Sequence, residues 1–313
     1  MASLAEMFGA GHAGTFFGLA ECRDLSRVQA DIVLIGASGC TPYPSVGFYC
    51  ATGPQAIRAA GVAYGAALGH VNFDLGGPVL PDGVVAVDAG DLPQDLDDAP
   101  GNRARIFGAI GQVLDAGAVP VLIGGDDSLP IPMLEAFGAR GRSFTILQID
   151  AHIDWRGEVE GERFGLSSTM RRASEMGHVE RIIQVGQRGI GSARPSDVQD
   201  ALDWGVAFVP GGEVARDGVW RAVDMVPDGA EVIVCLDVDA MDPGVMPAVI
   251  GRTAGGLSYW QVLELIGGVA EKARIAGFDL VELMPERDID GQGALLAAQV
   301  LAGVLGVIAR QRV

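Results

Sequence analysis

The segment FTILQIDAHID (residues 144–154) decides how the rest of the chain is interpreted. Its first part is a short apolar run with β-branched residues, typical of a buried strand, and this run ends in an acid, Asp150. Seven other runs have the same character: DIVLIG (31–36), GVVAVD (83–88), AVPVLIG (118–124), RIIQVG (181–186), GVAFVP (205–210), EVIVCLD (231–237) and FDLVEL (278–283). Together they predict a large sheet.

Longer segments with helical patterns separate these runs, near residues 54–68, 102–116, 129–139, 197–203, 258–276 and 291–310. Repeated alternation of strand and helix predicts a parallel sheet covered by helices on both faces. We find no internal repeat, and no Pro/Ser-rich linker or charge block divides the chain. The sequence therefore predicts an α/β fold, a single three-layer αβα domain over residues 1–313 with a mainly parallel sheet of about eight strands.

The composition excludes several classes of partner. Of the 313 residues 49% are hydrophobic, and the formal net charge of −18 argues against nucleic acid and anionic membrane surfaces. The four cysteines form no CxxC pair, which fits a reducing compartment. The N-terminal segment has no signal-peptide pattern, and no run approaches the length of a membrane span. We expect a cytoplasmic protein with no nucleic acid and no membrane as partner.

Acids stand at the ends of four predicted strands. They are Asp127, Asp150, Asp237 and Glu282. In open parallel sheets the chemistry lies beyond the carboxyl ends of the strands, so we expect these side chains to converge on one rim of the sheet.

Two of these strand ends carry further ligand-type residues at a spacing of two. Asp150, His152 and Asp154 form a D-x-H-x-D pattern, and Asp237 and Asp239 form D-x-D. Alternate residues of an extended segment point the same way, so each set can face one point. Packing these carboxylates together without cations would be prohibitive. Loop or helix caps are the better interpretation of a lone D-x-D, but two such patterns at strand ends favour a metal site. Its oxygen-rich ligands suit Mn²⁺ and can accept Ni²⁺ or Co²⁺.

Further motifs lie along nearly the whole chain: FYCATGPQAIRAAG (48–61), GGDDS (124–128), DAHID (150–154), FGLSSTMRRA (164–173), VGQRG (185–189), LDVDAMDP (236–243), GRTAGGLSYWQ (251–261) and DLVELMPERD (279–288). In this order they resemble the ureohydrolase family, the group that contains arginase, agmatinase and guanidinobutyrase. The agmatinase branch is the more similar one.

The resemblance implies an activity and a set of site residues. Ureohydrolases hold two manganese ions, sometimes nickel, at the positions occupied here by Asp127, Asp150, His152, Asp154, Asp237 and Asp239. A metal-bridging hydroxide attacks the guanidinium carbon, and urea leaves with an amine as coproduct. By resemblance Asp154 also orients the hydroxide, and Glu282 receives the guanidinium, for which a carboxylate is a natural acceptor. The family also implies a homo-oligomer, a trimer or a hexamer.

Two positions depart from the family pattern. The usual GGDHS motif is GGDDS here, so Asp127 replaces a histidine ligand, while Asp126 is interpreted as structural. The usual FGHGTxFRRA segment has Leu166 in place of a histidine thought to shuttle protons. Loss of a general acid or base typically lowers a rate by about 10²–10⁴. His12 is the remaining histidine that could reach the site from a loop or a neighbouring subunit.

Three functions therefore stay open. The first is a metal-dependent hydrolase of a guanidino or amidino compound. The second is a catalytically weakened paralogue that serves as a structural or regulatory subunit of a hetero-oligomer. The third is a single-metal amide hydrolase of the deacetylase type, which the absence of adjacent histidines disfavours. Trp155 and Arg156 either line the pocket, where Arg156 would bind a substrate carboxylate, or belong to a surface loop.

Overall fold

A nine-stranded parallel sheet forms the centre of the computed structural model, which describes residues 14–311. The spatial order is β1-β3-β2-β4-β9-β8-β5-β6-β7, and all neighbouring strands pair in parallel. The strands are β1 (Ala20–Glu21), β2 (Ile32–Ala37), β3 (Ala86–Asp91), β4 (Val119–Gly124), β5 (Phe144–Ile149), β6 (Val179–Val185), β7 (Ala207–Val209), β8 (Glu231–Asp237) and β9 (Arg274–Val281). The eight predicted strands are all present, and the short β1 is the one that was not predicted.

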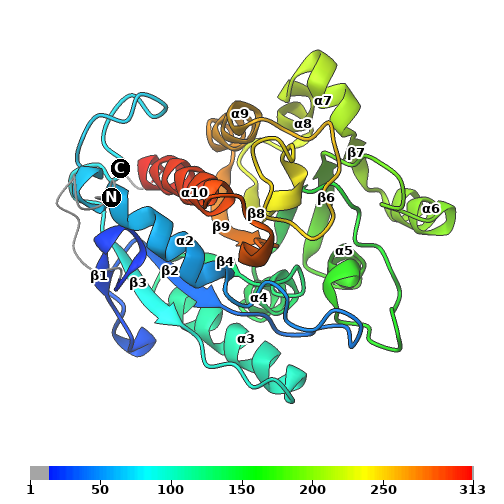
Figure 1. Ribbon diagram of the computed structural model, residues 1–313, viewed down its shortest axis with the longest axis horizontal. Helices are drawn as coiled ribbons and strands as arrows, with labels where there is room; N and C mark the ends of the chain where they lie inside the picture. Colours follow the sequence, from blue (N-terminus) through cyan, green and yellow to red (C-terminus); the bar gives the residue numbers. More distant parts are fainter. Residues whose placement is uncertain (1–13, 312–313) are drawn as a thin grey trace.

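Helices cover both faces of the sheet, so the three predicted layers are confirmed. One face carries α2 (Gly53–Gly61), α7 (Gly211–Asp217), α8 (Trp220–Met225), α9 (Tyr259–Ala270) and α10 (Gln292–Arg310). The other face carries α3 (Ala99–Asp115), α4 (Pro130–Gly138), α5 (Thr169–Ser174) and α6 (Pro195–Trp204). Figure 1 shows α9 and α10 on one side of the sheet and α3 and α4 on the other. Short 3₁₀ turns complete the set: η1 (Phe16–Gly18), η2 (Leu25–Arg27), η3 (Val62–Ala67), η4 (Leu166–Ser168), η5 (Val238–Ala240) and η6 (Pro285–Arg287).

The central strands are mostly apolar because both of their faces are buried. In β4, Val121 and Ile123 belong to the hydrophobic cluster under α2, α9 and α10, whereas Leu122 belongs to the cluster under α3 and α4. Successive side chains of a strand point to opposite faces, so a strand between two helical layers needs apolar residues at both parities. This is why the sequence shows continuous runs instead of alternation.

Helix α10 is long and apolar enough to cross a membrane by length and composition, which corrects the prediction that no run approaches the length of a membrane span. In the structure, however, 72% of the apolar stretch of α10 is buried. A core helix of a protein without membrane spans can have the same length and composition, because a helix packed on several sides is apolar around most of its circumference. We therefore interpret α10 as a core helix, packed beside α2 and α9.

Two helix predictions need correction. The predicted helix 258–276 ends earlier, because α9 stops at Ala270 and β9 already begins at Arg274, where it pairs with Glu231 of β8. The predicted helix 54–68 continues as α2 only to Gly61 and then becomes the 3₁₀ turn η3. The short helices α5, α7 and α8 were not predicted. The limits of the predicted domain, residues 1–313, extend beyond the described residues and stay a prediction.

The arrangement of the central strands positions the candidate site. Strands β4, β9, β8 and β5 are consecutive in the sheet, and each one runs into a segment that carries acids. The backbone also ties two of these ends together, since the Glu282 N–H donates to the carbonyl oxygen of Gly125 at 2.7 Å. The acids therefore leave the sheet side by side at its carboxyl edge.

Candidate active site

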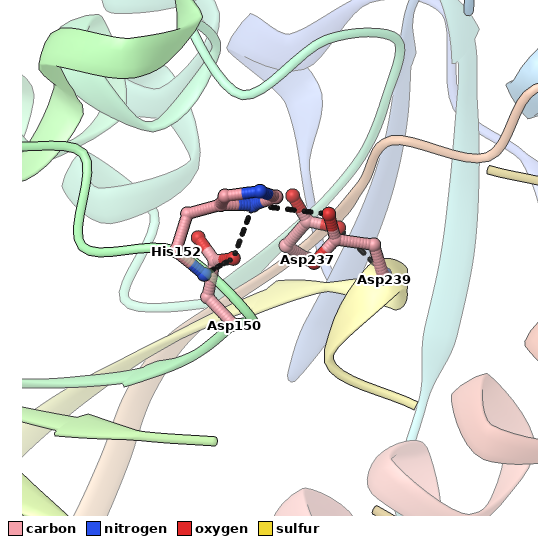
Figure 2. Close-up of side chains that lie close together, drawn as sticks. All are labelled: Asp150, His152, Asp237 and Asp239. Atoms are coloured by element: carbon pink, nitrogen blue, oxygen red, sulfur yellow. Dashed lines mark hydrogen bonds and ion pairs between the residues drawn. The ribbon is translucent and has the colours of Figure 1, made fainter. Parts of the chain in front are cut away.

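The acids at the ends of the four central strands come together, as the sequence indicates. Two groups form, and within each group one ligand atom per residue lies within 4.8 Å of all the others. The imidazole-containing group consists of Asp150, His152, Asp237 and Asp239 (Figure 2). The all-carboxylate group consists of Asp127, Asp150 and Asp154. Asp150 belongs to both groups, so it joins two adjacent positions that can each hold a cation.

His152 supplies the positive charge of the imidazole-containing group. Its Nδ1 lies 3.3 Å from Asp150 Oδ1 and 3.1 Å from Asp239 Oδ2, as Figure 2 shows. Burial alone would lower the pKa of His152, but its hydrogen bonds and ion pairs with these two carboxylates outweigh burial and raise the pKa to about 12. The same nitrogen thus faces the oxygens with which it would share a metal ion.

The carboxylates are short of positive charge even with His152 protonated. Burial, followed by neighbouring carboxylates, raises the pKa values of Asp127, Asp154 and Asp237 well above the ordinary range. Asp150 differs: burial raises its pKa, but hydrogen bonds with His152 and Asp154 bring the pKa down to about 2. Buried carboxylates at this spacing need a shared proton or a cation.

Two glutamines support the acids, Gln148 by direct hydrogen bonds and Gln184 through Gln148, and neither was predicted as a site residue. Gln148 Nε2 donates to Asp150 Oδ2 at 2.8 Å and to Asp154 Oδ2 at 2.7 Å. Gln184 Nε2 donates to Gln148 Oε1 and to the carbonyl oxygen of Ile153. A buried polar residue two positions before a ligand, inside an otherwise apolar strand, was the signal available. Such supporting contacts orient ligands and are part of a metal site's design.

Glu282 lies beside the all-carboxylate group and is itself nearly fully buried. Its Oε1 accepts a hydrogen bond from the Asp127 N–H at 2.8 Å. The hydroxyl of Tyr49 donates to the same carboxylate, 2.8 Å from Oε1 and 2.6 Å from Oε2. Burial raises the pKa of Glu282 to about 8 although the Tyr49 hydrogen bond opposes this shift. No role was predicted for Tyr49, because no sequence pattern relates Tyr49 to Glu282.

Two site residues have left-handed backbone conformations. The φ angles of Asp154 and Glu282 are +45° and +71°, in a region that residues other than glycine rarely occupy. Such conformations cost roughly 1–3 kcal/mol each and persist where surrounding contacts hold them. Here the Glu282 N–H to Gly125 hydrogen bond and the Gln148 contact to Asp154 supply that support.

A pocket of about 190 Å³ opens over these groups. Its walls include Glu282 together with Asp127 and Asp237, so the candidate guanidinium acceptor and both cation positions face one space. Leu166 lines the same wall, which puts an apolar side chain where the family pattern has a histidine.

Trp155 and Arg156 also line the pocket, so their interpretation as a plain surface loop does not hold. Trp155 is 2% exposed and packs edge-on against Trp204, with ring centroids 6.3 Å apart. Arg156 Nη1 lies 3.2 Å from Asp197 Oδ2. Arg156 therefore reaches the pocket already paired with an acid.

Asp126 and His178 occupy structural positions. Asp126 accepts hydrogen bonds from the backbone N–H and the hydroxyl of Ser128, which matches its predicted structural role. His178 stacks near Phe144 and contacts the carbonyl oxygen of Leu134, away from the pocket. His12 lies outside the described residues. Within residues 14–311, His152 is the one histidine that lines the pocket.

The residues present fit divalent cations. Asp127 Oδ2 is buried, and no N–H or O–H from the described part of the chain donates to it. The donor atoms of the two groups are carboxylate oxygens and one imidazole nitrogen, without a thiolate. Such donor sets suit hard and borderline ions such as Mn²⁺.

A parallel α/β fold with two adjacent divalent-cation positions at the carboxyl edge of its sheet defines this chain as an α/β metalloprotein. The family model of the Arginase family matches residues 30–306, and the chain belongs to that family. Chicken mitochondrial agmatinase is 31% identical over 265 residues, which are 82% of this chain and 75% of that protein.

Solved structures agree with the fold. Proclavaminate amidino hydrolase from Streptomyces clavuligerus superposes with a TM-score of 0.80 at 26% identity, over 96% of this chain and 99% of that one. Formiminoglutamase from Trypanosoma cruzi, solved with Mn²⁺, has a TM-score of 0.76 at 21% identity over 91% and 97% of the two chains.

Proposed function

We propose that the protein is a divalent-metal-dependent hydrolase that cuts a C–N bond in a guanidino or amidino compound, releasing urea and an amine as agmatinases do. The single observation that carries this proposal is that Glu282 shares one pocket with both carboxylate groups. A carboxylate suits the planar fork of N–H donors of a guanidinium, and the neighbouring groups suit cations. Family membership and the chicken agmatinase relative support this reading.

Different residues of the chain have different roles in the proposed reaction. Asp150, His152, Asp237 and Asp239 would hold one ion, and Asp127, Asp150 and Asp154 the other. Divalent ions bound here would lower the pKa of a water molecule and neutralise the buried acids. Mn²⁺ is the proposed ion, with Ni²⁺ and Co²⁺ as alternatives; the T. cruzi neighbour was solved with Mn²⁺. Glu282 would accept the guanidinium, and Asp154, to which Gln148 donates a hydrogen bond, would accept a proton from the attacking water.

The far end of the substrate would meet the pair formed by Arg156 and Asp197. Both residues line the pocket, and they carry opposite charges 3.2 Å apart. Arg156 can attract a carboxylate tail and Asp197 an amine tail. A panel of substrates therefore has to contain both kinds of tail. A cytoplasmic homo-oligomer, trimeric or hexameric, stays part of the proposal.

The test is urea release from a panel of agmatine, 4-guanidinobutyrate, arginine, guanidine and biguanides. The purified protein is stripped of metal, reloaded with Mn²⁺, Ni²⁺ or Co²⁺, and its metal content is measured in parallel. We expect urea from at least one member of the panel with loaded protein and none with stripped protein. The Glu282→Gln variant serves as the control, because it keeps the metal ligands and loses the guanidinium acceptor.

The absence of urea release from every compound of the panel, at full metal occupancy, would overturn the proposal. It would favour the alternative of a weakened subunit that depends on an active relative.

A further inference from the structure

We propose that the Tyr49 hydroxyl is a competing donor that closes the guanidinium acceptor Glu282 and has to leave it before a substrate binds. This inference rests on the proposed function, since it deepens the role of Glu282 in it. Tyr49 and Glu282 both line the pocket, so the contact between them is made within the space that the substrate would enter.

The geometry places the tyrosine hydroxyl between the two carboxylate oxygens. Tyr49 Oη lies 2.8 Å from Glu282 Oε1 and 2.6 Å from Oε2, so it contacts both atoms at once. Oε1 also accepts the Asp127 N–H at 2.8 Å. A guanidinium bound by both oxygens presents two parallel N–H groups to this same edge of a carboxylate. The hydroxyl and a bidentate guanidinium therefore exclude each other.

Glu282 is the more deeply buried of the two residues, and Tyr49 is partly exposed. The carboxylate is nearly fully buried, on a residue whose φ of +71° is held by the hydrogen bond from its N–H to Gly125. Tyr49 is half-buried and lies in the irregular segment between β2 and α2. Gly47, two residues earlier, has a φ of +61°, which L side chains rarely adopt. Displacement is therefore a change in Tyr49 and not in Glu282.

This competition would favour cationic ligands over neutral ones. A tyrosine hydroxyl is a single neutral donor that satisfies the buried carboxylate when the pocket is empty. A guanidinium brings charge and two donors and displaces it, because charge-assisted hydrogen bonds are about twice as strong as neutral ones. Urea has only neutral donors, so it does not displace the Tyr49 hydroxyl from Glu282. Tyr49 would thus help the site to retain the substrate and to release the product.

The experiment compares wild type with Tyr49→Phe, both loaded with Mn²⁺. Calorimetry measures the Kd of guanidinium chloride and of urea, and steady-state assays give KM and kcat on the substrate found in the panel. We expect Tyr49→Phe to bind guanidinium about tenfold more tightly, the scale of one hydrogen bond to a charged group. KM should fall with it, and urea should become a measurable inhibitor.

Two controls make the result specific. Tyr64→Phe removes another tyrosine hydroxyl, one that accepts a hydrogen bond from Gln299 far from Glu282, and should leave every constant unchanged. The double variant Tyr49→Phe with Glu282→Gln should lose the gain in affinity. Tyr49→Leu, which also lacks the hydroxyl, repeats the test if the phenylalanine variant is unstable.

Unchanged or weaker guanidinium binding in Tyr49→Phe would overturn the inference and leave Tyr49 as a positioning residue that merely orients Glu282. Because the Kd values and urea release are measured in separate experiments, this outcome is distinct from a wild type that binds guanidinium but hydrolyses nothing, which overturns the proposed function alone.

Discussion

Asp127 is the residue that separates this site from the family pattern. It lies in the all-carboxylate group with Asp150 and Asp154, and its Oδ2 is buried, with no hydrogen-bond donor among residues 14–311. The substitution of a histidine therefore keeps a side chain with a ligand atom in place but turns one cation position into an oxygen-only site. Such sites favour Mn²⁺, Mg²⁺ or Ca²⁺ over ions that prefer nitrogen ligands.

Restoring the histidine should change the metal preference of this position. We expect Asp127→His to bind Ni²⁺ and Co²⁺ about tenfold more tightly and Mg²⁺ more weakly, because imidazole suits the former ions. Calorimetric titration of metal-free protein with each ion measures the change. Leu166→His is the control, since it adds an imidazole to the pocket outside both ligand groups. An identical order of affinities in wild type and Asp127→His would remove Asp127 from the ligand set.

Asp237→Asn and Glu282→Gln should separate metal binding from substrate binding. Asp237 belongs to the imidazole-containing group, and an amide supplies no negative charge, so we expect metal content to fall from about two ions per chain to one or fewer. Glu282→Gln should keep its metal and lose about 10²-fold or more in kcat/KM. Elemental analysis and urea assays on both variants give the answer. Full occupancy of Asp237→Asn would contradict the placement of the site.

The sequence could predict the ligands but not their supports. D-x-H-x-D and D-x-D at strand ends are local patterns, and the parallel sheet brings them together, so five of the six candidate ligands follow from spacing and topology. Asp127 was assigned by resemblance to the family motif. The role of Tyr49 does not follow from spacing, because its contact with Glu282 joins segments 233 residues apart. The role of Gln148 was missed because its bond to Asp154 depends on the path of the irregular segment after β5. The pairing of Arg156 with Asp197 likewise joins the loop after β5 to the first turn of α6, and no sequence pattern relates the two.

At the scale of elements, strands were easier to predict than helix ends. The continuous apolar runs identify β2 to β9 because strands buried on both faces need no polar residues. The end of α9 was missed because RIAGFDLV (274–281) is apolar and follows an apolar helix, and periodicity alone does not distinguish a buried helix from a buried strand. Helices of six or seven residues, such as α7 and α8, are too short to show a period.

The junction of β2, β4 and β9 offers a test of how these elements position the site. Gly125 follows β4, and a Cβ there would overlap the carbonyl oxygen of Ser38 after β2. Gly125 also accepts the Glu282 N–H, so Gly125→Ala should push apart the strand ends that carry Asp127 and Glu282. We expect a loss of about 1–3 kcal/mol in the free energy of unfolding, measured by denaturant titration, together with most of the activity.

Gly108→Ala is the matched control for this change. Gly108 lies inside α3, and a Cβ there meets no heavy atom within 4 Å. Alanine should stabilise that helix by about 0.5–1 kcal/mol and leave activity unchanged. A Gly125→Ala variant as stable and as active as wild type would show that the strand ends have more freedom than the described contacts indicate.

At the scale of the whole molecule, stability without metal should depend on pH. The pKa values of Asp127, Asp154 and Asp237 are raised well above 3.8, by burial first and then by neighbouring carboxylates such as Asp150, so the folded chain binds protons more tightly than the unfolded one. Stability is therefore lost as pH rises above 3.8 toward the folded values. His152 acts in the same direction between 6.5 and about 12.

We therefore expect the Tm of the metal-free protein to fall from about pH 5 to about pH 8, because the buried groups lose their protons more readily in the unfolded chain than in the folded one. Saturating Mn²⁺ should raise Tm at every pH and most at the alkaline end, since metal and protons compete for the same oxygens. At about a thousand times Kd each ion adds about 4 kcal/mol. Thermal melts with and without chelator measure this; a metal-induced rise in Tm that shrinks with increasing pH would contradict it.

The division of the pocket between sheet and loops has a consequence for evolution. The candidate metal ligands lie at or after the ends of three strands of one sheet, β4, β5 and β8, where a shift of one residue would misplace these acids. Leu166, Ser192 and Ile250 face the same pocket from separate loops and turns, where substitutions leave the sheet untouched. Catalytic machinery and substrate choice can thus be inherited separately. A gene library randomised at these three positions alone should yield descendants that hydrolyse new guanidino compounds while folding and loading metal as their parent does.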